Sequence, residues 1–171
     1  MDINVKTQSE ILKCGYVPKK IKGSGTYGLV YSVSDKKDEI FAFKYIAPSE
    51  IYKIHGLENL TEIDLLSKID HPNIMQAAKI LTSYDYQIDG LAIVMPLADK
   101  TLYDYLQDPT ITTDTKLPIL YKIGKAIEFL HKNNILHLDI KLNNVVLQNN
   151  NPLLIDFGIS LIVDDSSIGR C

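Results

Sequence analysis

Apolar and polar residues alternate in short blocks along the first half of the chain, and each block ends at turn-forming residues. Such alternation is typical of β-strands. The pattern predicts a pair of strands around a glycine-rich turn in residues 16–33, and further strands in residues 40–46, 77–84 and 91–95. Val30, Tyr31 and Val33 are β-branched or aromatic, so the residues after the glycines favour a strand.

Two longer segments place apolar residues at helical spacing instead. Residues 56–69 carry an apolar residue at every third position from Leu60, and His71-Pro72 ends this helix because the residue before a proline avoids the helical region. Residues 116–132 give the longest helical pattern, with one apolar side made of Leu117, Leu120, Ile123, Ile127 and Leu130. A short helix is predicted at 102–106, and short apolar runs follow at 135–136, 145–147 and 153–155, the last two joined by a turn at 148–151.

Strands with one helix, followed by helices with one small hairpin, indicate an α+β fold. The 171 residues are 46% hydrophobic and 23% charged, as in a globular protein of one domain or two small lobes. The net charge is −3 and the basic residues are scattered, so we expect no nucleic-acid and no membrane partner. Cys14 and Cys171 lack metal-ligand spacing and residues 1–13 lack a signal-peptide pattern, so we expect a reduced compartment, cytoplasmic or nuclear.

The glycine-rich turn matches the pattern G-x-G-x-x-G-x-V. It reads Gly23-Ser24-Gly25-Thr26-Tyr27-Gly28-Leu29-Val30. Glycines allow positive φ and let backbone amides approach a phosphate closely. A dinucleotide-binding turn would open a helix, whereas a strand is predicted here. We therefore expect a β-hairpin flap that lies over phosphate groups.

A lysine stands inside the next apolar strand, in Phe41-Ala42-Phe43-Lys44. It could be an edge residue whose ammonium reaches water, or it could bind phosphates as a compact charge on one side of the strand. In the second case it needs a carboxylate partner. Glu62 is the candidate, and Glu58 and Asp64 are its rivals.

Two polar stretches follow the long helix: His137-Leu138-Asp139-Ile140-Lys141-Leu142-Asn143-Asn144 and Ile155-Asp156-Phe157-Gly158. Asp139 can accept a hydrogen bond from an attacking hydroxyl and act as a base, and Lys141 can neutralise a phosphoryl group. Asn144 and Asp156 offer the oxygen donors that Mg²⁺ prefers. Each alone could be an ordinary turn or capping residue, but the motifs occur together and in order, which favours phosphoryl transfer.

These motifs resemble those of the eukaryotic-type protein kinase superfamily over about residues 16–165. The resemblance implies a protein-kinase-like α+β fold, in which an N-terminal antiparallel β-sheet lobe with one helix (the family's αC) precedes the first part of a mainly helical lobe. The implied parts are a lead-in at 1–15, a small lobe at 16–95, a hinge at 96–98 and a truncated large lobe at 99–171. Among the acidic candidates, only Glu62 has the family's spacing to His71-Pro72-Asn73-Ile74.

The resemblance also implies ATP and Mg²⁺ as cofactors, Asp139 and Lys141 as catalytic residues, and Asn144 and Asp156 as metal ligands. The residues around ATP would be Gly23, Ser24, Gly25, Thr26, Tyr27, Gly28, Val30, Ala42, Lys44, Glu62, Met95, Pro96, Ala98 and Val146. Among them, Met95 would be the gatekeeper beside the adenine, and the carbonyl of Pro96 and the backbone of Ala98 would contact it. Leu66, His137 and Phe157 would stack as an internal column.

Lys141, two residues after Asp139, resembles the serine/threonine kinases, so the expected reaction transfers the γ-phosphoryl of ATP to a Ser or Thr hydroxyl of a protein substrate. Leu138 replaces the arginine of H-R-D, which pairs with a phosphate on the activation loop. We therefore expect activity that does not depend on phosphorylation of Ser160, Ser166 or Ser167.

No A-P-E motif follows before Cys171. We therefore expect an apolar face of residues 116–132 that is exposed or covered by a partner, or else a truncated or fragmentary chain. The alternative function is an ATP-binding, decoy or regulatory module with little catalytic activity.

Overall fold

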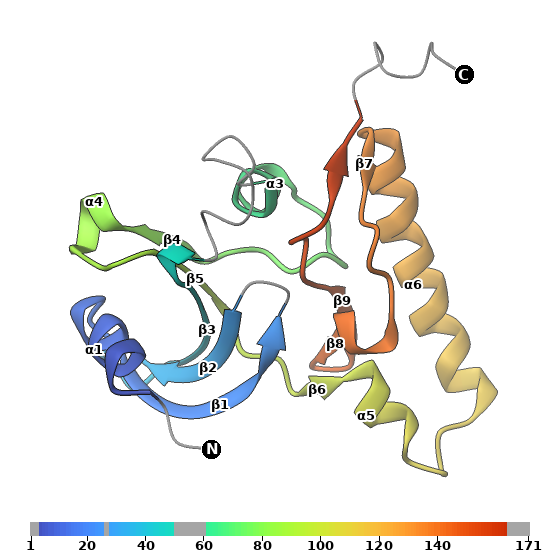
Figure 1. Ribbon diagram of the computed structural model, residues 1–171. Helices are drawn as coiled ribbons and strands as arrows, with labels where there is room; N and C mark the ends of the chain where they lie inside the picture. The colour runs from blue at the N-terminus through green and yellow to red at the C-terminus, as the bar shows by residue number, and fades with distance from the viewer. Residues whose placement is uncertain (1–3, 26–27, 50–60, 164–171) are drawn as a thin grey trace. The chain divides into compact units, whose positions relative to one another are not determined.

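The computed structural model describes residues 4–25, 28–49 and 61–163, and of these it leaves out the side chains of 24, 25 and 61–64. The chain divides into two compact units: unit 1 comprises residues 1–63 and 76–97, and unit 2 comprises residues 64–75 and 98–171. Both contain helices and strands, so the predicted α+β class is confirmed (Figure 1). Among the described residues, no helix has the length and apolar character needed to cross a bilayer.

A five-stranded antiparallel sheet forms most of unit 1. Its spatial order is β1 (Val17–Gly25), β2 (Gly28–Ser34), β3 (Ile40–Ile46), β5 (Leu91–Pro96) and β4 (Lys79–Thr82). The strands predicted at 40–46 and 91–95 are confirmed. The strand predicted at 77–84 is too long, because Ser83–Tyr86 forms the short helix α4. There the Thr82 hydroxyl donates to the Asp85 carboxylate at 2.9 Å, a local bond that favours a helical turn over a continued strand.

A helix that the sequence did not predict begins the described chain. α1 (Val5–Lys13) starts at Asn4, whose side-chain oxygen accepts a hydrogen bond from the Lys6 amide at 2.9 Å. Ile11 is fully buried, and it belongs to the same apolar cluster as Tyr31 and Phe43 of the sheet. The lead-in is therefore part of the core of unit 1.

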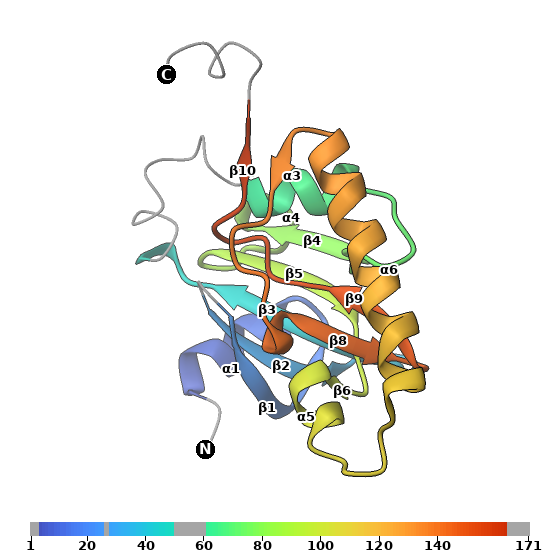
Figure 2. The same ribbon diagram turned by 90° about the vertical axis from the view of Figure 1, so that its right-hand side faces the viewer.

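Unit 2 is built around one long helix and two small sheets. Its elements after residue 97 are β6 (Lys100–Thr101), α5 (Leu102–Leu106), α6 (Thr113–Lys132), β7 (Ile135–Leu136), the 3₁₀ turn η2 (Leu142–Asn144), β8 (Val145–Gln148), β9 (Asn151–Leu154) and β10 (Leu161–Ile162). One sheet has the order β6-β8-β9, and the other pairs β10 with β7. Figure 2 shows β8 and β9 crossing the direction of α6, which contacts β9.

The predicted hairpin at 145–155 is confirmed as β8 and β9. Val145 pairs with Leu154, and Gln148 pairs with Asn151. The two turn residues, Asn149 and Asn150, have φ of 50° and 62°. A two-residue hairpin turn of type I′ needs positive φ at both positions, and asparagine tolerates that conformation well.

The long helix is confirmed, and the expectation that its apolar side is left exposed holds for Leu120 but is wrong for Leu130, which is buried. The buried residues of α6 are Ile119, Ile123, Ala126 and Leu130, whereas Leu117 and Leu120 are 57% and 58% exposed. Apolar residues occur on more than one side of this helix, so periodicity alone could not decide which side meets β7 and β9. The helix predicted at 56–69 is described from Thr61 to Lys68 as α3, and residues 56–60 lie outside the described ranges.

Candidate active site

One face of the unit 1 sheet gathers several of the predicted nucleotide-binding residues. Directly paired residues of neighbouring strands point to the same face, and alternate residues along a strand point to opposite faces. Lys44 of β3 pairs with Val30 of β2, and Ala42 pairs with Met95 of β5. Val30, Ala42, Lys44 and Met95 therefore share one face. Phe43, between Ala42 and Lys44, points to the other face, where α1 packs.

Lys44 is buried at the centre of the sheet. β3 lies between β2 and β5, and Lys44 is only 3% exposed. The alternative of an edge lysine that reaches water is therefore wrong. A buried ammonium is stable only with a compensating interaction, and Lys44 has one. The side chain of its predicted partner, Glu62, lies outside the description.

The glycine-rich segment forms a hairpin. Gly25 at the end of β1 pairs with Gly28 at the start of β2, and β2 then continues as a strand to Ser34. This strand excludes the dinucleotide-binding alternative, which requires a helix at that position. A Cβ atom on Gly28 would clash with the carbonyl oxygen of Tyr45, so this glycine is needed for the close approach of β2 to β3. Thr26 and Tyr27 lie outside the described residues.

The predicted catalytic loop of unit 2 forms a tight hydrogen-bonded cluster around Asp139. The Lys141 ammonium lies 2.7 Å from Asp139 Oδ2, and the Asn144 side-chain amide donates to the same oxygen at 2.7 Å. The same amide donates to the Asp139 backbone carbonyl at 2.9 Å. Both of these side chains contact Oδ2, so Oδ1 is the oxygen with which Asp139 could accept a proton from a hydroxyl.

His137 is a buried neutral ring that hydrogen-bonds the backbone of this loop. The Asp139 amide donates to Nδ1 at 3.2 Å, so the proton of the neutral imidazole lies on Nε2, which is 3.1 Å from the Ile155 carbonyl oxygen. Burial lowers the pKa of His137 below its ordinary value, which favours this uncharged form. The ring also packs against Phe157, with centroids 4.8 Å apart. His137 thereby joins the Asp139 loop to the segment that carries Asp156.

The two predicted metal ligands lie on adjacent hydrogen-bonded segments. The Ile155 amide donates to the Asn144 carbonyl at 2.9 Å, and Asp156 is the next residue. Asp156 has φ of 64°, a left-handed conformation that is uncommon outside glycine and that often marks functional sites. Because Asn144 donates through Nδ2, its side-chain Oδ1 is oriented as an acceptor. An amide oxygen and a carboxylate fit the donor preference of Mg²⁺.

The turn at residues 71–75 pairs with β9 along the edge of that strand that does not pair with β8. Ile74 and Leu154 form a parallel bridge, in which the Leu154 amide donates to the Asn73 carbonyl and the Met75 amide donates to the Leu154 carbonyl, each at 2.9 Å. Asn73 itself is buried, and its side-chain amide donates to the Pro152 carbonyl at 2.8 Å. The position of this turn in the sequence carries no local signal for its contacts with β9.

The structure also gives positions for the remaining residues predicted to contact adenine and for the predicted internal column. Val146 is buried in β8, where it pairs with Thr101 and Leu153. Pro96 pairs with Phe41 and so lies on the sheet face opposite to Met95. Ala98 belongs to unit 2 and is partly buried. Of the predicted column, Leu66 is buried, as are His137 and Phe157.

Comparison with known proteins identifies the family. A family model described as Protein kinase domain matches residues 16–168. Mitogen-activated protein kinase 13 of Arabidopsis thaliana is 31% identical over 150 residues, which cover 85% of this chain and 41% of the relative. Serine/threonine-protein kinase ULK3 of Homo sapiens is 31% identical over 153 residues, covering 85% and 32%, and serine/threonine-protein kinase Nek11 of Homo sapiens is 32% identical over 166 residues, covering 91% and 24%.

The chain therefore belongs to the protein kinase family. The resemblance found in the motifs is confirmed over nearly the whole chain. The chain spans between 24% and 41% of the length of these three relatives.

Proposed function

We propose that the protein is an ATP- and Mg²⁺-dependent serine/threonine protein kinase. The observation that carries the proposal is the cluster in which Asp139 Oδ2 contacts both Lys141 and Asn144 at 2.7 Å. A base, a cation and an amide oxygen within one short loop are what phosphoryl transfer needs, because its transition state requires positioning and charge neutralisation more than covalent catalysis. The names of the relatives, two of which are serine/threonine-protein kinases, favour the same substrate class.

In the proposed reaction, the oxygen of a Ser or Thr hydroxyl forms a bond to the γ-phosphorus of ATP, and the bond from that phosphorus to ADP breaks. Asp139 orients the hydroxyl and takes its proton. Lys141, whose side chain is 53% exposed, is free to swing its ammonium between Asp139 and the transferred group. Mg²⁺ held by Asn144 and Asp156 would offset the negative charge of the phosphates.

The face of unit 1 described above would bind the nucleotide. Val30, Ala42 and Met95 would contact the adenine, and Lys44 would bind the α- and β-phosphates, with Glu62 as its carboxylate partner. The hairpin of Gly23, Ser24, Gly25, Thr26, Tyr27 and Gly28 would cover the phosphates with backbone amides. Pro96, Ala98 and Val146 complete the proposed adenine contacts.

Regulation by activation-loop phosphorylation is not expected, because Leu138 stands where the family has arginine. Leu138 is exposed with φ of 62°, and a leucine cannot pair with a phosphate. Ser160 is buried and its hydroxyl donates to the His137 carbonyl at 3.1 Å, so it is a poor site of modification. A Ser166→Asp substitution that raised the rate substantially would contradict this part of the proposal.

The test separates nucleotide binding from transfer. Thermal shift with and without Mg²⁺ measures binding, and transfer of labelled phosphate to a generic protein substrate measures activity. We expect Lys44→Met to lose the Mg-ATP shift, whereas Lys37→Met, in the exposed turn before β3, keeps it. Asp139→Asn should keep binding and lower kcat by roughly 10²–10⁴. Transfer at the wild-type rate in Asp139→Asn would refute the catalytic assignment, and binding without any transfer in the wild type would favour the ATP-binding module.

A further inference from the structure

Asn151, the first residue of β9, makes three side-chain hydrogen bonds to separate parts of unit 2. Its Oδ1 accepts from the Lys122 ammonium of α6 at 3.0 Å and from the Asn73 side-chain amide at 3.2 Å. Its Nδ2 donates to the Pro72 carbonyl at 2.9 Å. Asn151 therefore links α6, the turn at residues 71–75 and the β8–β9 hairpin.

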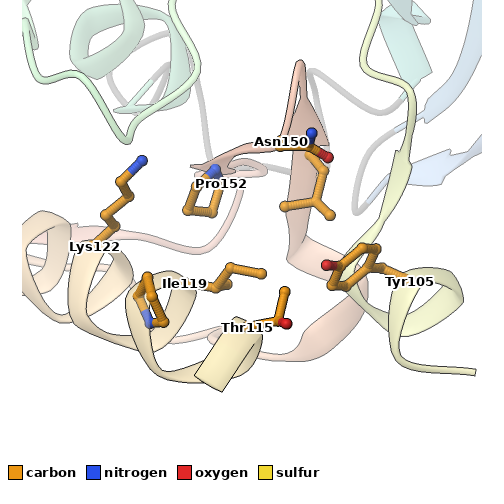
Figure 3. A pocket seen from close by; sticks show the side chains of 8 residues that line it. Tyr105, Thr115, Ile119, Lys122, Asn150 and Pro152 are labelled. Carbon is orange, nitrogen blue, oxygen red and sulfur yellow. The ribbon is translucent and has the colours of Figure 1, made fainter. Parts of the chain in front are cut away.

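Lys122 is the residue of α6 that contacts Asn151. Lys122, Pro152 and Ile119 are among the residues that line a cavity of ≈ 330 Å³. In Figure 3, Lys122 and Pro152 lie on the same side of this cavity. Of the eight side chains that line the cavity, only Lys122 is charged. Its ammonium donates to the amide oxygen of Asn151, and within the described residues it forms no ion pair with a carboxylate, so an uncharged amide fixes the end of this side chain.

The strand that begins at Asn151 ends at Leu154, two residues before the proposed metal ligand Asp156. Downstream of Asn151, the Leu154 amide and carbonyl bond the turn at residues 73–75, and the Ile155 amide bonds the Asn144 carbonyl. Asp156 follows in a left-handed conformation. The register of β9 against the turn thus sets where Asp156 lies relative to Asn144, and Asn151 fixes that register at the other end of the strand.

We propose that Asn151 is a positioning residue for the Asp156 carboxylate: through Lys122, Asn73 and Pro72 it holds β9 in register with the turn and with α6. The inference rests on the proposed function, since it assigns Asp156 to the metal. Asn151 lies outside the motifs that define the family resemblance, and a strand-opening asparagine would ordinarily be interpreted as a turn residue.

A graded set of variants removes the three bonds together or the bonds to Pro72 and Lys122 one at a time. Asn151→Ala removes all of them. Asn151→Asp keeps an oxygen that accepts from Lys122 and Asn73 but loses the donor to Pro72. Lys122→Met removes only the bond to α6 and keeps the aliphatic stem. Asn150→Gly is the matched control, because Asn150 has φ of 62°, which glycine adopts readily, and its side chain makes no hydrogen bond to the described residues.

The first measurement is amide hydrogen exchange of the metal-free chain. Loss of the Asn151 bonds should let the turn separate from β9 more often, so the Met75 and Leu154 amides should exchange about tenfold faster in Asn151→Ala. Asn150→Gly should exchange as the wild type does. Asn151→Asp and Lys122→Met should fall between them.

The second measurement is the Mg²⁺ concentration that gives half-maximal ATP binding and half-maximal transfer. Outer partners of metal ligands typically affect affinity by 10–100-fold, so we expect a rise of roughly tenfold for Asn151→Ala, with Asn151→Asp partly restoring it. A loss of folded protein alone would lower the amplitude and leave the half-saturation point unchanged.

The outcomes distinguish the two proposals. Unchanged exchange at Met75 and Leu154 in Asn151→Ala overturns the inference, and so does faster exchange with a wild-type Mg²⁺ half-saturation. If the wild type itself shows no Mg²⁺-dependent ATP binding, the proposed function fails, and with it the assignment of Asp156 that the inference needs. Faster exchange together with a raised Mg²⁺ requirement, absent in Asn150→Gly, supports the inference.

Discussion

Removal of the Ile11 side chain tests whether α1 is an integral part of unit 1. Ile11 is fully buried in the cluster that contains Phe43 and Tyr45 of β3. These two residues flank Lys44 in the strand, on the opposite face of the sheet. If α1 supports the back of the sheet, Ile11→Ala destabilises the strand that carries the proposed phosphate-binding lysine.

The expected magnitude follows from the volume removed. Ile→Ala deletes three carbon groups, and each buried group contributes about 0.8 kcal/mol, which gives roughly 2.4 kcal/mol before any cavity term. Measured substitutions of this kind cost about 2–5 kcal/mol. Against a total stability of about 5–15 kcal/mol, this loss is large, and at roughly 2–4 °C per kcal/mol it should lower Tm by about 4–20 °C.

Leu12→Ala is the matched control. Leu12 is the next residue of the same helix but is 52% exposed, so its truncation removes similar chemistry without a cavity. Urea unfolding should show a lower midpoint for Ile11→Ala and little change for Leu12→Ala. Hydrogen exchange should also show faster opening of β3 in the first variant only. Equal, small effects of both substitutions would refute the view that α1 belongs to the core.

Three further predictions concern stability. Burial lowers the pKa of His137, so below about pH 6.5 the unfolded chain binds more protons than the folded chain and stability is lost as the pH falls. Between about pH 7.5 and 5.5, Tm should therefore fall less in His137→Phe than in the wild type. Substitution of the exposed His131 by Gln should leave the wild-type fall in Tm unchanged. Gly28→Ala should cost about 1–3 kcal/mol because its Cβ meets the Tyr45 carbonyl, whereas Gly23→Ala, which has open space, should be near neutral in urea unfolding. The buried carboxylate of Glu10 accepts a hydrogen bond from the Asp89 amide at 2.7 Å. Glu10→Ala should therefore lower the free energy of unfolding, measured in urea, by about 1–3 kcal/mol, and Glu10→Gln should lower it by less.

The sequence predicted elements wherever the signal was local. The strands at 40–46 and 91–95 follow from alternation, and the β8–β9 hairpin follows from the polar residues 148–151 between two apolar runs, although only Asn149 and Asn150 form the turn. α1 was missed because only one narrow side of so short a helix is apolar. For α6, the exposed Leu120 agrees with the expected unpartnered apolar side, whereas Leu130 is buried, because periodicity does not tell which apolar residues of a helix meet other elements.

The site residues were predicted from the family resemblance of the motifs and not from local periodicity. Their order and spacing indicated the family, and the family is confirmed. Their individual functions stay predictions that the proposed experiments test. For Asp139, Lys141 and Asn144, the structure adds that the last two side chains both contact Asp139 Oδ2, a geometry that fits their proposed functions in phosphoryl transfer.

By itself, the sequence determined the α+β class, the kinase motifs and the residue types available for chemistry, because each depends on neighbours a few positions apart. Only the tertiary structure decided which distant groups meet. Lys44 lies buried in β3, which pairs with β2 on one side and with the sequence-distant β5 on the other, and Asn73 reaches Asn151 across 78 positions of the chain. Such contacts depend on the path of the whole chain, which local periodicity does not encode.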